Sequence, residues 1–452
     1  MCKYCFRGFF SFRTKAFRKA ENRNSGRMRR LRFRGVFFMN TGNIGFMLIC
    51  SALVFFMTPG LSLFYGGLVR RKNVINTMFA STFTIGTGIV MWMLFGYSLS
   101  FGQDHGGIIG SLEWLGLNGV SLTEPYTEGG GIPNMVFCIF QMMFAVITPA
   151  LITGAVAGRM KFRSLFLFLV FWTLIVYYPM AHMVWGAGGF LKEIGSIDFA
   201  GGNVVHITSG ISALLLCILL GKRCDLGEAN YRMHNIPMIA TGAFILLFGW
   251  FGFNAGSALA ADGLAVHAFI TTAVSSAAGM LSWMLCDKVV NHKPTFVGAC
   301  TGLVAGLVGI TPGAGYVPVW AALIIGFTTS PVCFTMISVA KEKFGYDDAL
   351  DAFGCHGVGG IWGGICTGLF AQTSINPDAR WNGLLFGDVQ LFGVQILSIV
   401  ISIAVAIVGT LICYGLTKLL THDLRVDKKD ERLGLDRTQH DESAYPSFNG
   451  LD

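Results

Sequence analysis

The chain has 452 residues, of which 53% are hydrophobic and only 13% are charged, and its mean hydropathy is +0.60. Soluble domains carry about 25% charged residues, so this composition excludes a soluble enzyme, a disordered chain and a small disulfide scaffold. The 59 glycines are typical of membrane helices that pack closely through small residues. The sequence therefore predicts an all-α membrane protein that crosses the bilayer several times.

The net charge of +8 comes from one end of the chain. Residues 1–38 contain 12 of the 33 Lys and Arg and one of the 25 acidic residues, so the remainder carries 21 − 24 = −3. This distribution removes the support for a nucleic-acid partner. The segment lacks the pattern of a signal peptide, and Met39 opens a polar stretch before the first apolar run. We interpret 1–38 as a basic extension that is disordered or precedes the true start; a solvated basic arm is the alternative.

Eleven apolar runs follow, each close to the roughly 20 residues that cross a bilayer as a helix. They lie at 42–68, 74–102, 134–158, 164–186, 199–220, 236–258, 264–286, 296–312, 317–340, 351–372 and 389–420. Residues 39–420 are thus predicted to form the transmembrane domain, and the charged residues 421–452 a regulatory tail. The 12 cysteines mostly lie inside these runs, and Cys2-x-x-Cys5 has no second pair, so neither a disulfide framework nor a metal site is expected.

Loop charge predicts the orientation of the spans. The loops after odd-numbered spans carry 13 basic residues, whereas those after even-numbered spans carry only Lys192 and Arg380. Positive loops stay in the cytoplasm, which predicts an outside N-terminus and an inside C-terminus. The 13 residues are Arg70, Arg71, Lys72, Arg159, Lys161, Arg163, Lys222, Arg223, Arg232, Lys288, Lys293, Lys341 and Lys343.

An internal repeat carries ionisable residues into the membrane. Asp198 and His206 open the fifth span with the spacing Asp, seven residues, His, and Asp348 and His356 open the tenth span in the same way. Five spans separate the two motifs, so the halves are predicted to be inverted five-helix repeats followed by one long final helix. Eight residues advance a helix by about 12 Å. The two histidines are therefore expected to meet at similar depth.

Histidines inside a span are functional candidates, because burying an ionisable group in lipid is costly. Two symmetry-related histidines strengthen the case over one hydrogen-bonded core histidine. Asp198 and Asp351 are interpreted as supports, since acids at helix N-termini accept backbone N–H bonds. Aromatic residues near the outer span ends offer faces that attract a small cation, although core or interfacial packing also explains them; they are Phe144, Trp185, Trp250 and Phe253.

These motifs resemble the ammonium transporter family (Amt, Mep and Rh), on the bacterial Amt side. The similar segments run in the family's order and are Phe55–Gly60, Phe64–Arg70, Phe140–Ala145, Ala181–Gly186, Asp198–His206, Gly249–Ser257 and Phe353–Gly360. The family's Ala-Glu-Arg after the third span reads Ala157-Gly158-Arg159 here, so one acid is missing. The segment from Gly434 to Tyr445 resembles the family's C-terminal motif.

The resemblance implies a role for each matching residue. Phe144, Trp185 and Ser257 match the outer ammonium-binding site, and Phe144 with Phe253 matches the stacked pair that gates the pore. His206 and His356 match the twin histidines of the conduction path. Asp198 and Trp250 match supporting positions, and Thr301 and Asp351 lie near the inner half of the path in similar proteins. Thr438 matches a position phosphorylated in some plant relatives.

The resemblance implies a transporter rather than an enzyme, without a cofactor or metal. It implies ammonium uptake across the cell membrane by outer binding, deprotonation and passage of ammonia through a twin-histidine pore. It also implies a homotrimer in lipid and a cytoplasmic partner of the PII nitrogen-signalling type. Two alternatives from the same fold remain, a passive ammonia gas channel and an ammonium sensor signalling through its tail. A redox protein that binds haem through the two histidines is a rival of another class.

Overall fold

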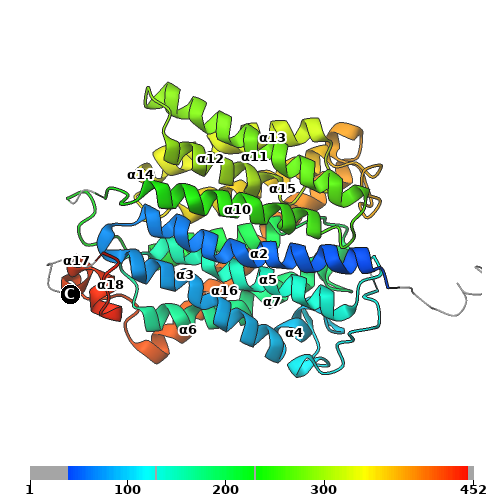
Figure 1. The fold of residues 1–452 in the computed structure, drawn as a ribbon, viewed down its shortest axis with the longest axis horizontal. Coiled ribbons are helices and arrows are strands. Elements are labelled where there is room, and N and C mark those ends of the chain that lie inside the picture. The colour runs from blue at the N-terminus through cyan, green and yellow to red at the C-terminus, as the bar shows by residue number, and fades with distance from the viewer. Residues whose placement is uncertain (1–38, 128–129, 229–230, 446–452) are drawn as a thin grey trace, which may run out of the picture.

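The computed structural model describes residues 39–127, 130–228 and 231–445 (Figure 1). The predictions for 1–38, and for the last residues of the tail, lie outside this part. Roughly parallel helices run along the long axis of the molecule. The short helices α17 and α18 lie at one end of the bundle, which we call the tail end, and α4 lies toward the other end (Figure 1). The small hairpin of β1 and β2 follows α4, so we call that other end the hairpin end.

The elements follow the predicted apolar runs closely. The helices are α2 Thr41–Leu68, α3 Val74–Met91, α4 Tyr97–Phe101, α5 Asn134–Ile152, α6 Phe162–Trp172, α7 Tyr178–Trp185, α8 Phe190–Glu193, α9 Thr208–Leu220, α10 Ile236–Gly256, α11 Gly263–Val290, α12 Phe296–Ile310, α13 Val319–Thr335, α14 Lys341–Phe344, α15 Val358–Phe370, α16 Val389–Thr421, α17 Lys428–Leu433 and α18 Leu435–His440. Strands β1 (Asp104–His105) and β2 (Ile109–Gly110) pair antiparallel, with Asp104 opposite Gly110.

Short turns of other helix types join these segments. Wider, π-helical turns are η2 Trp92–Gly96, η5 Thr173–Tyr177, η6 Gly202–Ile207, η7 Met336–Ala340 and η8 Phe353–Gly357. Tighter 3-10 turns are η1 Arg71–Asn73, η3 Leu115–Leu117, η4 Thr153–Val156 and η9 Leu384–Phe386. The apolar pattern did not predict the π turns, which are often found at functional sites.

Within the described residues, nine helices are long and apolar enough to cross a membrane. The predicted spans at 296–312 and 351–372 correspond to shorter segments, α12 and the combination of η8 with α15. The chain is therefore mostly helical with several candidate spans. The count of eleven and the orientation of the termini remain predictions.

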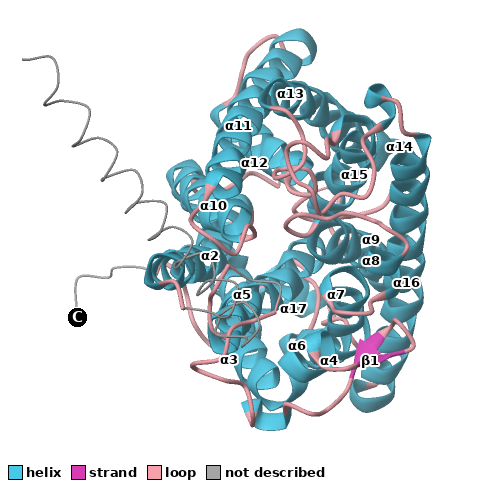
Figure 2. Ribbon diagram, turned by 90° about the vertical axis from the view of Figure 1, so that its right-hand side faces the viewer, coloured by secondary structure: helices cyan, strands magenta, loops and turns pink. Residues whose placement is uncertain are grey.

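The two halves of the chain approach each other through glycine. A Cβ atom on Gly242 of α10 would lie 2.6 Å from the carbonyl oxygen of Gly60 on α2, and one on Gly210 of α9 would lie 2.1 Å from the backbone nitrogen of Gly357 in η8. Both distances are too short for a real side chain. Small residues thus let the backbones of the halves meet directly, and Figure 2 shows α2 beside α10 in the view along the bundle.

Buried ion pairs hold the loops at the tail end. Asp347, which precedes η8, accepts hydrogen bonds from the Arg223 side chain, the shortest at 2.6 Å from Nη2. Arg159 is fully buried and donates to the carbonyl oxygens of Gly221 and Asp347. Backbone carbonyl oxygens thus accept the hydrogen bonds of Arg159, although Gly158 stands where the family has an acid.

The tail packs against the loop between α2 and α3. The Asp436 carboxylate accepts the backbone N–H of Asn76 at 2.9 Å, and the Leu435 N–H donates to the Asn73 side chain at 2.9 Å. Lys72 also donates to the carbonyl oxygen of Arg432. Burial raises the pKa of Asp436. The described part of the tail is therefore docked on its own bundle.

Replacing Asp347 by Asn should lower the thermal stability of the purified protein. Burial raises the pKa of Asp347, but the hydrogen bonds and charge of Arg223 outweigh burial and hold this pKa below its usual value. Removing one partner of a buried ion pair costs about 3–5 kcal/mol. Because the pKa is lowered on folding, this contribution is present at neutral pH and is lost as the pH falls below 4.

Melting curves in detergent at pH 7 and pH 3.5 check this prediction. The control is Asp427→Asn, because Asp427 is exposed and its side chain caps nothing. Equal melting temperatures of Asp347→Asn and the unmodified protein at pH 7 would contradict it.

Candidate functional site

A cavity of about 540 Å³ opens at the hairpin end and is lined by Phe144, Trp185 and Ser257. The Phe144 and Trp185 rings meet edge to face with centroids 5.9 Å apart. The indole N–H of Trp185 donates to the carbonyl oxygen of Asp198 at 2.9 Å, and the Ser257 hydroxyl donates to the carbonyl oxygen of Phe253 at 2.9 Å. Since the hydroxyl uses its proton internally, its oxygen presents lone pairs to a donor. We call it the outer cavity, because the predicted orientation of the spans places the hairpin end outside. It combines aromatic faces with a hydrogen-bond acceptor.

Gln141 is a residue of this cavity that the sequence motifs did not single out. It lines the outer cavity one turn before Phe144, and its Oε1 atom is buried without a hydrogen-bond partner among the described residues. A buried acceptor without a partner is costly, and a ligand N–H would satisfy it. Its place in the motif Phe140–Ala145 was the available signal.

A stacked aromatic pair separates the outer cavity from a second one. The Phe144 and Phe253 rings have centroids 4.2 Å apart and planes inclined by 25°, and each side chain is 1% exposed. Phe144 lines the outer cavity, whereas Phe253 lines the second, inner cavity. The two stacked rings therefore lie between the outer and the inner cavity.

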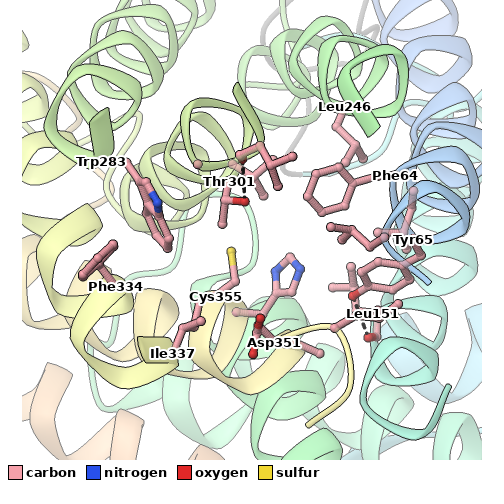
Figure 3. A pocket seen from close by; sticks show the side chains of 18 of the residues that line it. Phe64, Tyr65, Leu151, Leu246, Trp283, Thr301, Phe334, Ile337, Asp351 and Cys355 are labelled. Carbon is pink, nitrogen blue, oxygen red and sulfur yellow. Dashed lines mark hydrogen bonds between the residues drawn. The ribbon is translucent and has the colours of Figure 1, made fainter. Parts of the chain in front are cut away.

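The inner cavity has a volume of about 270 Å³ and a mostly apolar wall. Figure 3 shows Trp283 and Phe334 on one side and Phe64 and Tyr65 on the other, with Thr301 and Asp351 between them. The predicted residues Trp250, Thr301, His206, His356 and Asp351 all line this cavity. The structure thus places these five residues and Phe253 around one cavity, whereas the predicted residues Phe144, Trp185, Ser257 and Asp198 line the outer cavity.

His206 and His356 contact each other directly in this cavity. Their Nδ1 atoms are 3.3 Å apart, their rings are nearly parallel with centroids 5.3 Å apart, and they are 1% and 4% exposed. One Nδ1 must donate and the other accept, so the pair fixes complementary tautomers. The Nε2 atom of His206 is buried without a partner within the described residues. The predicted meeting of the two histidines is confirmed.

Each histidine lies on a π turn whose start is held by an aspartate. The Asp198 carboxylate accepts four backbone N–H groups, from Gly201, Gly202, Asn203 and Val204, at 2.6–3.4 Å. The Asp348 carboxylate accepts those of Ala352 and Phe353 at 3.1 and 2.7 Å. Carboxylates at helix N-termini satisfy donors that have no partner inside the helix. These contacts set the turns that carry His206 and His356.

The backbone N–H contacts that the sequence analysis expected of Asp351 are made by Asp348. Asp348 makes the helix-terminal contacts, and Asp351 instead forms an ion pair with Lys341 at 2.7 Å. Asp351 also has a positive φ of 60°, which side chains rarely adopt. The acid that makes the helix-terminal contacts is thus Asp348, which seven residues separate from His356, and not the nearer Asp351.

Trp250 supports the histidine pair from the side. Its indole N–H donates to the Thr311 hydroxyl at 2.9 Å, and its ring stacks on His206 with centroids 5.5 Å apart. The anchored indole therefore limits rotation of the His206 ring.

Known proteins resemble this chain over most of its length. A model of the Ammonium Transporter Family matches residues 45–445. The chain belongs to this family. An ammonium transporter of Bacillus subtilis is 49% identical over 407 residues, covering 90% of this chain and 99% of that protein. A putative ammonium transporter of Methanothermobacter thermautotrophicus is 46% identical over 410 residues, covering 90% and 99%.

Solved structures of similar proteins share the fold of this transporter. The crystal structure of Saccharomyces cerevisiae Mep2 matches with a TM-score of 0.80 at 35% identity, covering 87% of this chain and 89% of that one. A structure described as a sensor Amt protein matches with a TM-score of 0.80 at 28% identity, covering 88% and 98%. Family membership and the long apolar helices make this chain a multi-pass membrane protein.

Replacing Asp198 should destabilise the turn that carries His206. Asp198→Ala leaves four buried N–H groups without an acceptor, each costing about 1–3 kcal/mol, whereas Asp198→Asn keeps one acceptor oxygen. The melting temperature should therefore fall more for Ala than for Asn, with Asp427→Ala as the exposed control. An unchanged melting temperature in Asp198→Ala would refute this role.

Proposed function

We propose that this family member carries ammonium into the cell across the cell membrane by binding it in the outer cavity, removing a proton and passing ammonia along the histidine pair. The observation that carries the proposal is the direct contact of His206 with His356 in an apolar cavity behind the Phe144–Phe253 pair. That arrangement offers hydrogen bonds to ammonia and a route for the proton that ammonium loses.

The outer cavity supplies what a small cation requires. Cation–π contacts to Phe144 and Trp185 contribute about 0.5–2 kcal/mol each, depending on desolvation. The lone pairs of Ser257 and the free Oε1 of Gln141 accept ammonium N–H groups. We assign substrate binding to these four residues. The tetrahedral donor pattern of ammonium suits scattered acceptors of this kind.

A bare cation has a much higher free energy in the inner cavity than in the outer one. Moving an ion of this size from water to a medium of dielectric constant near 4 costs on the order of 20 kcal/mol, and the cavity wall is mostly apolar. Loss of one proton removes this cost. We assign the gate to Phe144 and Phe253. We assign the supporting wall of the inner cavity to Trp250, Thr301 and Asp351.

Histidine suits the proton step because its pKa lies near neutrality and its two ring nitrogens donate and accept. We assign the relay to the Nδ1 contact between His206 and His356, with the unpartnered Nε2 of His206 receiving the incoming proton or ammonia. Potassium has no proton to lose, so this route rejects it. The direct 3.3 Å contact also leaves no space for a porphyrin between the rings, which argues against the haem rival.

Two alternatives share these residues. A passive channel would move ammonia without net charge. A sensor would act through the docked tail, and one structural neighbour is described as a sensor Amt protein. We assign a homotrimer and a partner of the PII type at the tail end as the assembly, on the strength of the family resemblance.

The deciding experiment records current on a supported membrane carrying the reconstituted full chain after an ammonium pulse, with potassium as the control. A current specific to ammonium indicates electrogenic transport with deprotonation and a proton relay. Alkalinisation inside vesicles without current indicates the passive channel. Absence of both signals contradicts the proposal and favours sensing.

His206→Ala should abolish the ammonium current, since it breaks the Nδ1 link between the two rings and removes the orphan Nε2 acceptor. The expected loss is at least tenfold at equal protein density. Thr82→Ala serves as the control, because Thr82 lies on α3 and lines none of the cavities described. A His206→Ala protein of normal melting temperature that conducts ammonium normally would refute the relay.

Gln141→Leu should raise the ammonium concentration that gives half-maximal current. A hydrogen bond to a charged group contributes about 1.5–3 kcal/mol, so the shift should be roughly tenfold or more. Ser257→Ala should shift it in the same direction, whereas Thr82→Ala, on α3 and part of none of the cavities described, should leave it unchanged. If Gln141→Leu lowers only the maximal current, Gln141 is not a ligand.

A further inference from the structure

A third cavity, of about 220 Å³, lies at the tail end, between the loop after α2, the loop after α9 and helix α14. Three cationic side chains line it, those of Arg70, Arg223 and Lys341, and no acidic side chain of the described residues does. Asn73 and Tyr231 add polar groups to the same wall. Among the three cavities described, this cationic lining is particular to the third. The inner cavity is lined by Asp287 and Asp351 without a described lysine or arginine, and the outer cavity mixes both signs.

The three cations are fixed from outside the cavity. Arg70 pairs with Asp225 at 2.7 Å, Arg223 with Asp347 at 2.6 Å and Lys341 with Asp351 at 2.7 Å. None of these three carboxylates lines the third cavity. The acids thus hold the cationic side chains in place while the cations form the cavity wall. Such a set is organised for a ligand before the ligand arrives.

An aromatic ring further restrains the two arginines. The guanidinium carbons of Arg70 and Arg223 lie 4.2 and 4.1 Å from the centroid of the Tyr231 ring. The Tyr231 hydroxyl donates to Asp225, which pairs with Arg70. In addition, Arg70 Nη2 is buried without an acceptor among the described residues. The site therefore has donor capacity that its own acids do not use.

We propose that this third cavity binds a phosphate group, either as inorganic phosphate or as a small phosphate monoester. Guanidinium groups match the tetrahedral oxygens of phosphate and form paired hydrogen bonds with them. A doubly charged phosphate suits a wall with three cations better than a single carboxylate does. The volume also exceeds by far the roughly 10–15 Å³ that one water requires, which leaves space for a small organic group.

The position of this site connects it to two other parts of the transporter. Leu68 and Leu350 line both the third and the inner cavity, and Asn73 accepts the N–H of Leu435 in the tail. A bound phosphate would lie between the end of the inner cavity and the docked tail. The proposal does not depend on ammonium conduction, since binding is measured without ammonium.

Titration calorimetry on the purified full chain in detergent tests the site, with inorganic phosphate and glycerol 3-phosphate as probes and chloride holding ionic strength constant. Two variants attack it differently. Lys341→Gln removes a cation, and Ala349→Leu fills the cavity while leaving every charge in place. The matched control is Lys343→Gln, because Lys343 is exposed in the same short helix α14 and does not line the cavity. Melting temperatures without probe establish that each variant is folded.

The expected result is saturable binding of at least one probe to the unmodified protein and to Lys343→Gln, weakened at least tenfold in both Lys341→Gln and Ala349→Leu. Tighter binding of glycerol 3-phosphate identifies a phosphate monoester as the ligand, and equal or tighter binding of inorganic phosphate identifies the free ion. Absence of saturable binding to both probes overturns the proposal. Binding that a folded Ala349→Leu protein retains in full also overturns it.

Discussion

The positions of the two histidines depend on how the chain begins a helix inside an apolar environment. A helix that begins within the bundle exposes N–H groups, and no water is at hand to satisfy them. Asp198 and Asp348 meet this constraint from opposite ends of the molecule, each accepting the first N–H groups of a turn. Because the histidine follows each aspartate by eight residues, the two contacts also determine where His206 and His356 lie. The same carboxylates that stabilise the broken helices therefore position the pair of rings.

Close backbone approach is the second requirement for this geometry. Gly210, four residues after His206, lies against Gly357, the residue after His356, where a Cβ atom would be 2.1 Å from a backbone nitrogen. Gly360 plays a similar part, since its Cβ atom would lie 2.9 Å from that of His206. Glycine weakens an isolated helix, yet here it lets the two halves of the chain meet beside the rings. The high glycine content is thus tied to particular contacts at the centre of the transporter.

The sequence predicted the features that depend on local pattern. Apolar run length identified the helices to within a few residues, and the repeated spacing of Asp198 with His206 and Asp348 with His356 predicted the contact now seen. The sequence did not predict features that depend on tertiary contacts. The choice of Asp348 over Asp351 follows from Lys341, which lies seven residues before Asp348 and binds Asp351. The orphan oxygen of Gln141 and the π turns likewise arise from packing that periodicity does not encode.

The charges of the three cavities follow an order along the bundle that fits the chemistry of the proposed path. The outer cavity offers aromatic faces and acceptors that suit a cation, and the inner cavity offers an apolar wall with neutral hydrogen-bonding rings that suit ammonia. At the tail end, cationic side chains line the third cavity beside the carboxylates of the inner one. On the proposed path, an ammonium ion that forms again at this end would meet the carboxylates of the inner cavity, with the cationic wall of the third cavity beside them. An anion in the third cavity would add negative charge beside these paired cations, so its binding would change the potential that the departing ion experiences.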